Sequence, residues 1–464
     1  MNARLLRIYH RLPARARSAA ATLRGWYLKR WRYGRESEQL IEEALARDAW
    51  SAAQWKKWCE ERIAYILHRA ATRVPFYRDH WAERRRRGDR ASWEVLEHWP
   101  IIEKDDVRVD PRAFVADDCD TRGMFHEQTS GTTGKPIDIW RSRTTVATLH
   151  AIADARTSRW DGIPDGVRWA RLGGQLVTPV RQRRPPFWVW NAAMRQLYLS
   201  SFHLAPDFIP HYLDALRRYN IVYLASYPSS AHALAQEVVR LGRTDLGMAA
   251  VYTNAEPLTA EQRATITAAF QCPVRETYGM AESVAAASEC SAGRLHQWPE
   301  FGHVELHEHG EIVATGLLNP DMPLIRYRVG DRAQPPQNTP ARCSCGRGLP
   351  LMGHVEGRMN DVLLTPDGRP VFWLNPVFYG LPLRQSQIVQ EHLDVLRVRV
   401  TPAPGFTAAT ERTIVARLQE RMGDVRVIVD RVAEVPRTAN GKLRAIVCQL
   451  SEQEREMALA GRRA

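Results

Sequence analysis

Residues 129–136 contain the stretch Thr129-Ser130-Gly131-Thr132-Thr133-Gly134-Lys135-Pro136. Segments with alternating side chains flank it at 124–128 and 137–140, which predicts two strands joined by this loop. The glycines let backbone N–H groups approach an anion, the hydroxyl side chains add donors, and the lysine adds a positive charge. The loop therefore predicts a phosphate-binding site; the alternative is a surface hairpin turn made of turn-forming residues.

The loop differs from the P-loop of nucleoside triphosphatases at two positions. Thr129 stands where that motif has its first glycine, and Pro136 stands where it has serine or threonine. The phosphate-binding hypothesis therefore depends on the composition of the loop and on the other motifs of the chain.

The size and composition of the chain are those of a multidomain globular protein. With 464 residues we expect two or three hydrophobic cores, and 44% hydrophobic with 25% charged residues is typical of a soluble protein. No apolar run approaches the roughly 20 residues that a membrane-spanning helix needs. Arginines interrupt the apolar residues near the N-terminus, which argues against a signal peptide, so we expect a cytoplasmic location.

The N-terminus carries much of the net charge of +13, since no Asp or Glu precedes Glu36. Basic residues are interleaved there with Leu, Ile, Tyr and Trp, as in helices that lie on anionic lipid. Residues 1–35 can contact the inner membrane face peripherally, or they can pack their apolar side on the protein body, which we favour. No nucleic-acid-reading motif accompanies the charge, so we expect no nucleic-acid partner, and the sequence does not indicate an oligomeric state.

Periodicity divides the chain into three regions. Residues 1–120 form a basic, mostly helical region, residues 121–358 alternate strands and helices, and residues 359–464 form a small α+β domain. The predicted strands are 221–225, 249–253, 396–400 and 425–429, and the predicted helices are 229–241, 260–270 and 407–422. The alternation in the central region favours α/β layering with largely parallel strands.

Three further motifs accompany the loop. One places Tyr278 and Glu282 on either side of a glycine. A second ends in a Gly-Asp pair, whose Asp331 can present a carboxylate to sugar hydroxyls, and a third places Lys442 after a turn near the chain end. Each motif alone is compatible with a surface turn, but the four in this order are specific.

Together these motifs resemble the adenylate-forming superfamily of acyl-CoA synthetases, peptide-synthetase adenylation domains and luciferases. They resemble most the phenylacetate–CoA ligase-like branch with its capsule-biosynthesis relatives, and the resemblance covers almost the whole chain. It implies a large N-terminal α/β domain, to which residues 1–120 contribute, and a small mobile C-terminal α+β domain.

The resemblance also implies a role for each motif. The loop would hold the β- and γ-phosphates of ATP through Thr129, Ser130, Gly131, Thr132, Thr133, Gly134 and Lys135. The adenine would be flanked by Ala255, Glu256, Pro257 and Tyr278, and the ribose hydroxyls would be bound by Asp331.

The implied catalytic residues are Glu282, which would bind Mg²⁺, Arg358, which would support the nucleotide, and Lys442, which would reach the α-phosphate and the substrate carboxylate. Attack of a carboxylate on phosphorus brings anions together, so the site needs a metal and cationic side chains. Closure of the small domain would complete the site and exclude water.

Two positions depart from the commoner pattern of the superfamily. Ala281 replaces the usual threonine, and Asn360 occupies the hinge position where Asp or Lys is usual. Neither removes a charged participant in adenylation, and the final acceptor can be coenzyme A or another nucleophile.

Three of the seven cysteines and one histidine form a ligand-like pattern. Cys290, His296, Cys343 and Cys345 supply the Cys₃His set that a closed structural Zn²⁺ site uses. The arrangement also resembles zinc sites in some members of the same branch. Separate buried thiols are the alternative.

The acyl pocket implied by the resemblance would lie near Gly173, Gly174 and Tyr227. Trp188 and Trp190 can line this pocket or can be core aromatics. The sequence does not name the small-molecule carboxylic acid.

The function that we expect is ATP-dependent activation of a carboxylic acid to an acyl-adenylate, followed by acyl transfer to coenzyme A. A second hypothesis sends the acyl group to an amine or hydroxyl, for example in polysaccharide biosynthesis. A third is a non-catalytic nucleotide-binding protein that recruits partners.

Overall fold

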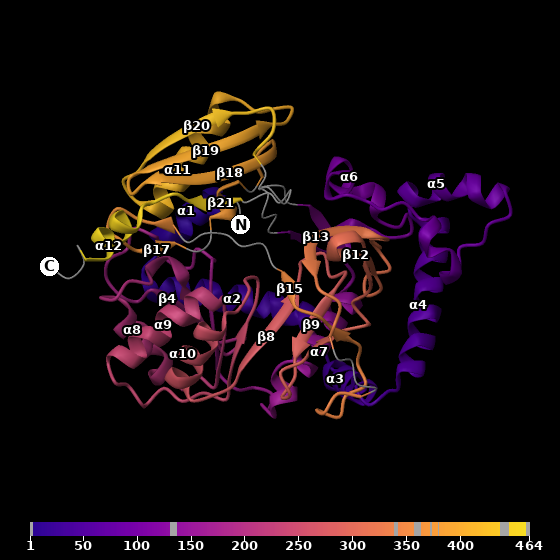
Figure 1. The fold of residues 1–464 in the computed structure, drawn as a ribbon, viewed down its shortest axis with the longest axis horizontal. Helices are drawn as coiled ribbons and strands as arrows, with labels where there is room; N and C mark the ends of the chain where they lie inside the picture. The colour runs from indigo at the N-terminus through magenta and orange to yellow at the C-terminus, as the bar shows by residue number, and fades with distance from the viewer. Residues whose placement is uncertain are drawn as a thin grey trace.

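The structure, a computed structural model, contains three larger sheets with helices around them (Figure 1). It describes residues 3–129, 137–337, 342–356, 363–371, 374–378, 380–436 and 445–460.

The central sheet has nine strands in the order β14-β10-β9-β8-β7-β6-β3-β5-β4. Its middle, from β8 to β5, is parallel, and antiparallel strands flank it on both sides. The strands are β3 (Trp169–Gly173), β4 (Trp188–Asn191), β5 (Gln196–Ser200), β6 (Tyr223–Ser226), β7 (Ala250–Thr253), β8 (Val274–Gly279), β9 (Ala286–Glu289), β10 (Leu295–Gln297) and β14 (Leu351–Met352). The largely parallel strands predicted for this region are confirmed.

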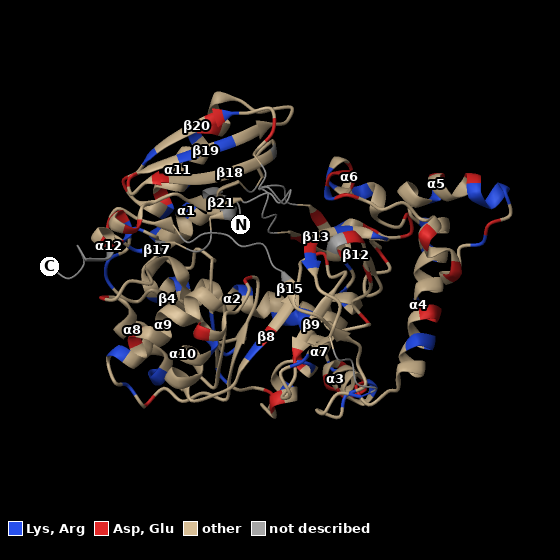
Figure 2. Cartoon of the chain, viewed as in Figure 1, with Lys and Arg blue, Asp and Glu red and all other residues tan. Residues whose placement is uncertain are grey.

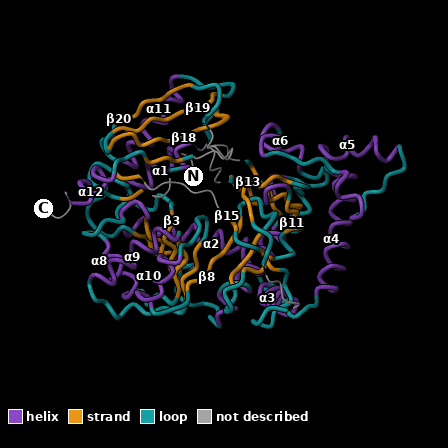
Figure 3. The backbone as a smooth tube through the Cα atoms, in the orientation of Figure 1, coloured by secondary structure: helices purple, strands orange, loops and turns teal. Residues whose placement is uncertain are grey.

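Helices cover both faces of the central sheet (Figures 1 and 3). The helices are α2 (Ala14–Arg32), α7 (Arg143–Ala155), α8 (Ile209–Arg218), α9 (Pro228–Arg240) and α10 (Ala260–Phe270). The last three share one buried core with Leu172 of β3, whereas α2 and α7 pack against each other on the other face. Because side chains alternate along a strand, Arg171 and Gly173 point to the α2 and α7 face.

Local sequence signals set the helix boundaries. The Thr259 hydroxyl accepts a 3.2 Å bond from the Gln262 N–H, and the Gln262 side chain accepts one of 3.1 Å from the Thr259 N–H. This capping box starts α10 where the sequence predicts it. Val74 is extended before Pro75, which ends one helix and begins the next.

A second, antiparallel sheet packs against the N-terminal helices. Its order is β11-β12-β13-β15, and its core also receives Ile137 and Ile139 from the β1–β2 hairpin. The elements of this region are α3 (Ser37–Arg47), α4 (Ala52–Arg73), α5 (Pro75–Arg86), α6 (Lys104–Val109), β1 (Phe125–Gln128), β2 (Asp138–Arg141), β11 (Gly302–Leu306), β12 (Glu311–Gly316), β13 (Tyr327–Ala333) and β15 (Val355–Glu356).

The C-terminal residues form a smaller α+β unit on top of the central sheet (Figure 1). Its four-stranded sheet has the order β20-β19-β18-β21. The elements are β16 (Leu363–Leu364), β17 (Pro370–Val371), β18 (Leu383–His392), β19 (Val395–Pro402), α11 (Ala408–Met422), β20 (Arg426–Arg431), β21 (Ile446–Cys448) and α12 (Glu452–Ala460). Val180 and Phe202 of the large unit belong to its hydrophobic core, and Arg369 donates a 2.7 Å bond to the Phe202 carbonyl.

The predicted fold class is confirmed: a large α/β unit is followed by a small α+β unit. The strands and helices predicted in both units are present, each within about two residues of its expected bounds. The domain boundaries at 120 and 358 stay predictions.

The N-terminal helices pack on the body with one side and expose the other. On α1 (Ala3–Arg11), Tyr9 and His10 bond to the carbonyls of Val177 and Leu176, while Leu5 is 57% exposed. On α2, Leu23 is 72% and Trp26 60% exposed. The N-terminal helices thus pack on the protein body, as the sequence favours. The membrane contact of residues 1–35 stays a prediction.

Charged residues lie along much of the described surface (Figure 2). Basic residues gather at the outer end of α5, where Arg85, Arg86 and Arg87 are exposed. In the described part of the chain, no helix has the length and apolar character needed to span a membrane. The cytoplasmic location stays a prediction.

Candidate nucleotide site and metal centre

The phosphate loop predicted at 129–136 sits between β1 and β2. The Thr129 N–H donates to the Ile137 carbonyl at 3.0 Å, and the Ile137 N–H donates to the Thr129 hydroxyl at 3.0 Å. These two bonds close the hairpin at the base of the loop. The remaining loop residues lie outside the described residues: Ser130, Gly131, Thr132, Thr133, Gly134 and Lys135.

Arg141 joins this hairpin to the turn that carries Glu282. The guanidinium of Arg141 is almost fully buried and donates to Glu127 on β1 at 3.0 Å. It also donates to the Ser283 hydroxyl at 3.1 Å and to the Ala281 carbonyl. Two motifs that are far apart in the sequence therefore meet in space.

Glu282 is held as a carboxylate. Its Oε1 accepts 3.2 Å bonds from the Lys104 ammonium and from the Tyr327 hydroxyl. Burial raises the pKa of Glu282, but the charge and hydrogen bonds of its partners outweigh burial and hold the pKa below its ordinary value. An ionised carboxylate of this kind suits an Mg²⁺ ligand.

Tyr278 and Asp331 lie side by side at the end of β8 and on β13. The Tyr278 hydroxyl donates to Asp331 Oδ2 at 3.1 Å. Next to Asp331, Arg332 of β13 lies opposite Glu356 of β15 in the strand register. Arg358 itself, like Asn360, lies outside the described residues.

The loop of Ala255, Glu256 and Pro257 follows β7, the strand beside β8. Glu256 accepts a 3.1 Å bond from the Ser229 N–H at the start of α9, and burial raises its pKa despite that bond. Ala255 has a φ of 66°, a left-handed conformation that non-glycine residues rarely adopt and that gathers at functional sites. This loop and Tyr278 lie at the carboxyl ends of neighbouring parallel strands, where ligands bind in open α/β sheets.

The residues expected at the acyl pocket also meet. The register of β3 and β6, which pairs Leu172 with Ser226, places Gly173 beside Tyr227. The Tyr227 hydroxyl is hydrogen-bonded to the Gly174 backbone, and burial raises its pKa to about 12.

Trp188 and Trp190 of the edge strand β4 have a different position. Both pack against the core that β3, β5 and β6 form with α8, α9 and α10, and Trp190 stacks on Tyr219 with ring centroids 4.9 Å apart. Gly173 and Tyr227 face the opposite side of the sheet. The geometry therefore favours core aromatics over pocket residues.

Lys442 lies outside the described residues, and only its flanks are described. Before it, the Val435 N–H donates to the Gln385 side chain at 2.9 Å, and after it Ile446 pairs with Ile388 in the small sheet. The role of Lys442 stays a prediction.

Three residues at this site are not among the predicted site residues. Lys104, Arg141 and Tyr327 bond the predicted residues from positions far away in the sequence, at separations of 178, 140 and 45 residues. Only Tyr327 lies in a predicted motif, the one that ends at Asp331. No local pattern identifies the other two.

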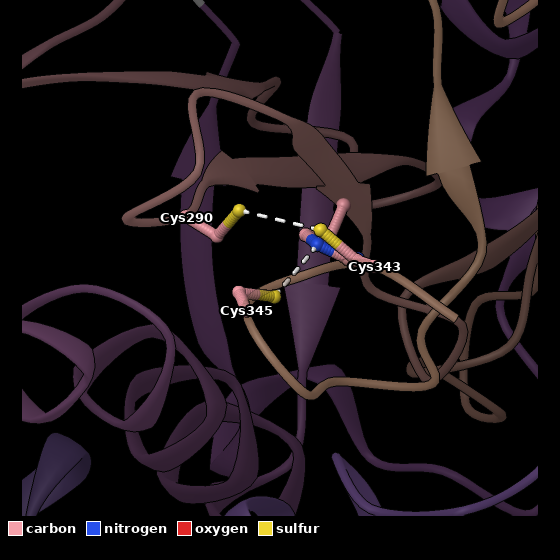
Figure 4. A group of neighbouring side chains, drawn as sticks. Cys290, Cys343 and Cys345 are labelled. Carbon is pink, nitrogen blue, oxygen red and sulfur yellow. Dashed lines mark hydrogen bonds between the residues drawn. The ribbon is translucent and has the colours of Figure 1, made fainter. Parts of the chain in front are cut away.

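The predicted metal ligands form a compact group (Figure 4). The ligand atoms of Cys290, His296, Cys343 and Cys345 all lie within 4.8 Å of one another. The Cys290 and Cys343 sulfurs are 3.9 Å apart, and the Cys345 sulfur is 3.4 Å from His296 Nε2. A tetrahedral zinc ion with ordinary bond lengths needs S–S edges of about 3.8 Å and S–N edges of about 3.5 Å, so the group fits zinc.

The surroundings of the group also fit a metal centre. His296 Nδ1 bonds to the Leu349 carbonyl at 3.1 Å, which orients Nε2 toward the sulfurs. Cys290 begins the turn between β9 and β10, and Cys343 and Cys345 lie on the segment that leads to β14. A metal at this position would join the strands after Glu282 to the approach to the hinge.

A separate hollow of about 760 Å³ lies elsewhere on the large unit. Trp55 and Ile63 of α4 line it together with Leu349 and Leu351. Of the predicted site residues, Cys343 alone borders it. It is therefore not the nucleotide site described above.

Known proteins resemble this chain in sequence. Residues 363–449 match the family described as the CapK C-terminal domain. Protein CapK of Staphylococcus aureus is 25% identical over 374 residues, which cover 77% of this chain and 81% of CapK. A phenylacetate–coenzyme A ligase of Thermus thermophilus is 27% identical and covers 69% of this chain and 73% of its own length.

Solved structures show the same fold. A 2-hydroxyisobutyryl-CoA ligase, solved with 2-hydroxyisobutyryl-AMP and CoA in the thioesterification state, superposes with a TM-score of 0.55. It is 21% identical, and the match covers 87% of this chain and 91% of the ligase. The resemblance predicted from the motifs is thus confirmed: this chain is similar in sequence to protein CapK and to the phenylacetate–coenzyme A ligases, and it shares its fold with an acyl-CoA ligase that has been solved with an acyl-adenylate.

Proposed function

We propose that this protein uses ATP and Mg²⁺ to activate a carboxylic acid as an acyl-adenylate and then transfers the acyl group, with coenzyme A as the acceptor. The observation that carries the proposal is the meeting of two pairs, Tyr278 with Asp331 and Glu282 with Lys104, beside the base of the hairpin loop. Groups suited to a nucleoside and a cation thus lie near the base of the predicted phosphate loop.

In the first step a carboxylate oxygen of the acid attacks the α-phosphorus of ATP, and the bond to the β-phosphate breaks to release pyrophosphate. The loop from Thr129 to Lys135 would hold the departing phosphates through N–H, hydroxyl and ammonium donors. Asp331 would accept from the ribose hydroxyls, and Lys442 would offset the charge at the attacked phosphorus. Mg²⁺, held by Glu282, would neutralise phosphate charge.

The acceptor in the second step is the finer part of the proposal. Two relatives are phenylacetate–coenzyme A ligases, which supports coenzyme A. The match of residues 363–449 to the CapK C-terminal domain favours keeping a second candidate, transfer to an amine or hydroxyl acceptor as in polysaccharide biosynthesis. The retained ionised Glu282 argues against the third hypothesis, a non-catalytic nucleotide-binding protein.

We also propose that Cys290, His296, Cys343 and Cys345 bind one structural Zn²⁺. The support is the gathering of the four ligand atoms within 4.8 Å of one another and the orientation of His296 by the Leu349 carbonyl. With four protein ligands the ion would have no open position for catalysis.

Exchange of labelled pyrophosphate into ATP, run over a panel of carboxylic acids, tests the first step. We expect exchange that depends on both Mg²⁺ and one class of acid. No exchange with any acid would contradict adenylation. With the active acid in hand, coenzyme A, amines and hydroxyl compounds can be compared as acceptors, and thioester formation would separate the two candidates.

A further inference from the structure

Two arginines lie near each other between the central sheet and its helices without an acidic partner. Arg171 is on β3, an interior strand of the sheet, and Arg32 is the last residue of α2. Among the described residues, neither side chain makes a hydrogen bond or an ion pair, and the Arg32 Nε is buried without a hydrogen-bond partner. Burial lowers the pKa of Arg32, and repulsion from Arg171 lowers it further.

The Arg171 side chain borders the expected acyl pocket. An added Cβ on Gly173 would lie 3.8 Å from the Arg171 Nε, so the side chain of Arg171 passes over Gly173. The strand register places Tyr198 of β5 beside Arg171, and Tyr227 beside Gly173. These four residues therefore share the face of the sheet toward α2 and α7.

Arg171 is solvent-exposed although its strand has neighbours on both sides. The opposite side of β3 is filled, since Ala170 and Leu172 are fully buried against α8, α9 and α10. The space between the sheet and the helices α2 and α7 is thus open where Arg171 projects. Tyr198 and Tyr227 are only partly buried and face the same space.

The positive charge of this space is not offset by the acidic side chains around it. The negative charge of Glu127 attracts both arginines, but its carboxylate accepts a 3.0 Å hydrogen bond from Arg141. Asp154 of α7 is hydrogen-bonded to Tyr33, and burial raises its pKa to about 7. The pocket therefore keeps an excess of positive charge.

Arg32 is partly buried with its Nε unpartnered, and the nearby Arg171 repels it, which destabilises the fold unless a ligand pairs with the two guanidinium groups. Arginine suits carboxylate and phosphate groups because its planar fork can donate two parallel bonds. We propose that the acid activated by this protein carries a second anionic group, which Arg171 and Arg32 bind in the acyl pocket. A dicarboxylic acid is the simplest such substrate. The inference rests on the proposed function, because Gly173 and Tyr227 border both sites.

The pocket also contains hydroxyl groups that can donate hydrogen bonds. Tyr198 lies beside Arg171, and burial raises the pKa of both Tyr198 and Tyr227, so both phenols stay protonated and can donate to an anion. His150 of α7 has a pKa well below its ordinary value because of burial and of three arginines, so it stays neutral. The two arginines, and not His150, are therefore the cations that would pair with the second anionic group of the substrate.

Pyrophosphate exchange with matched acids tests the inference. Each pair has one chain length and differs by a second carboxylate: an unbranched monocarboxylic acid against the α,ω-dicarboxylic acid, and phenylacetate against a carboxyphenylacetate. We expect kcat/KM to be at least about 10-fold higher for the dianionic member of the best pair, as for hydrogen bonds to a charged group. Equal or better use of the monoacids would overturn the inference.

Variants of Arg171 locate the effect. We expect Arg171→Gln to lower kcat/KM for the dianionic acid about 10- to 100-fold, mainly through KM, and to lower it far less for the monoacid. Arg171→Lys should restore part of the loss. Arg217→Gln on α8, whose arginine is largely exposed, is the matched control and should change neither acid. Equal losses for both acids in Arg171→Gln would contradict a role in selecting the substrate.

Thermal unfolding separates binding from a structural role. Arg32→Met and Arg171→Met remove an unpaired cation, so their Tm should equal or exceed that of the wild type. The dicarboxylic acid should raise the Tm of the wild type and not that of either variant. A lower Tm together with an unchanged acid preference would show that the arginines serve the fold and would overturn the inference.

The two proposals fail in different ways. Exchange that uses monoacids and ignores Arg171→Gln would leave adenylation standing and would remove the anion pocket. A dicarboxylic acid that stabilises the protein through Arg171 but supports no exchange would keep the pocket and contradict adenylation.

Discussion

Arg156 and Arg171 show two ways in which this protein holds a guanidinium group between its layers. Arg156 is completely buried and bonds to Glu300 at 2.6 and 2.8 Å and to Asp48 at 3.0 Å. Arg171 has no side-chain hydrogen bond or ion pair among the described residues, and it is open to solvent. Arg156 joins α7 to two other segments of the fold, whereas Arg171 is left available for a ligand.

The same distinction applies to the other polar groups of the molecule. Glu282 has partners on one oxygen, Lys104 and Tyr327, and remains ionised. In the Cys₃His group the Cys290 and Cys343 sulfurs lie 3.9 Å apart and the Cys345 sulfur lies 3.4 Å from His296 Nε2, distances that suit a common metal ion. How fully a polar group is satisfied by protein therefore indicates whether it serves the fold or a ligand.

Replacing Arg156 should have the largest effect on stability. Arg156→Met leaves the buried carboxylates of Glu300 and Asp48 without their main cation and should lower the free energy of unfolding by about 3–5 kcal/mol. Urea denaturation measures the loss. Arg159→Met, which breaks a partly exposed pair with Glu38, should cost less than about 1 kcal/mol. A loss for Arg171→Met as large as that for Arg156→Met would remove the distinction between the two arginines.

Glu282→Gln should separate activity from stability. The amide keeps the shape of the side chain but loses the charge for Mg²⁺, so exchange should fall about 100- to 1000-fold. Asp105→Asn on α6, near Lys104 in the sequence but exposed, is the control and should keep activity. Glu282→Gln with full exchange would show that Glu282 only serves the fold through Lys104.

Much of the fold and part of the site can be predicted from the sequence. Short sequence motifs contain the glycine-rich loop, Tyr278, Glu282 and Asp331. The chemical groups that these motifs offer can be recognised from the sequence alone. The periodicity of the central region likewise predicts β7 and α10.

Arg171 and Lys104 could not be predicted, for a physical reason. Arg171 is a single residue in an otherwise ordinary strand. It forms an unpaired cationic cluster only because the fold places it near Arg32, which lies on another element and carries the same charge. Lys104 meets Glu282 across 178 residues. Charge balance in three dimensions leaves no local pattern in the chain.

Zinc removal should have an intermediate effect. Purified without chelator, the protein should hold about one zinc per chain, and free zinc at 100 times its dissociation constant should stabilise the fold by about 2.7 kcal/mol. Cys343→Ser should lose the metal. Cys272→Ser, at a buried cysteine outside the group, should retain it. Wild-type protein free of zinc would contradict the metal centre.

The N-terminal surface should give the smallest effect. Basic residues near an anionic membrane contribute about 1 kcal/mol each, so co-sedimentation with phosphatidylglycerol vesicles should exceed that with phosphatidylcholine and fall with salt. Trp26→Ser should weaken binding, whereas Val239→Ser, at an exposed site on α9, should not. Equal sedimentation with both lipids would contradict the membrane contact and would show that α1 and α2 only pack on the protein body.

The central claim is that distant segments of the chain form one adenylating site, and Lys442→Ala tests it most directly. With the preferred acid and Mg²⁺, the rate of pyrophosphate exchange in this variant should be at least about 100-fold lower than in the wild type, while its Tm stays unchanged. Exchange at the wild-type rate in Lys442→Ala would contradict the account.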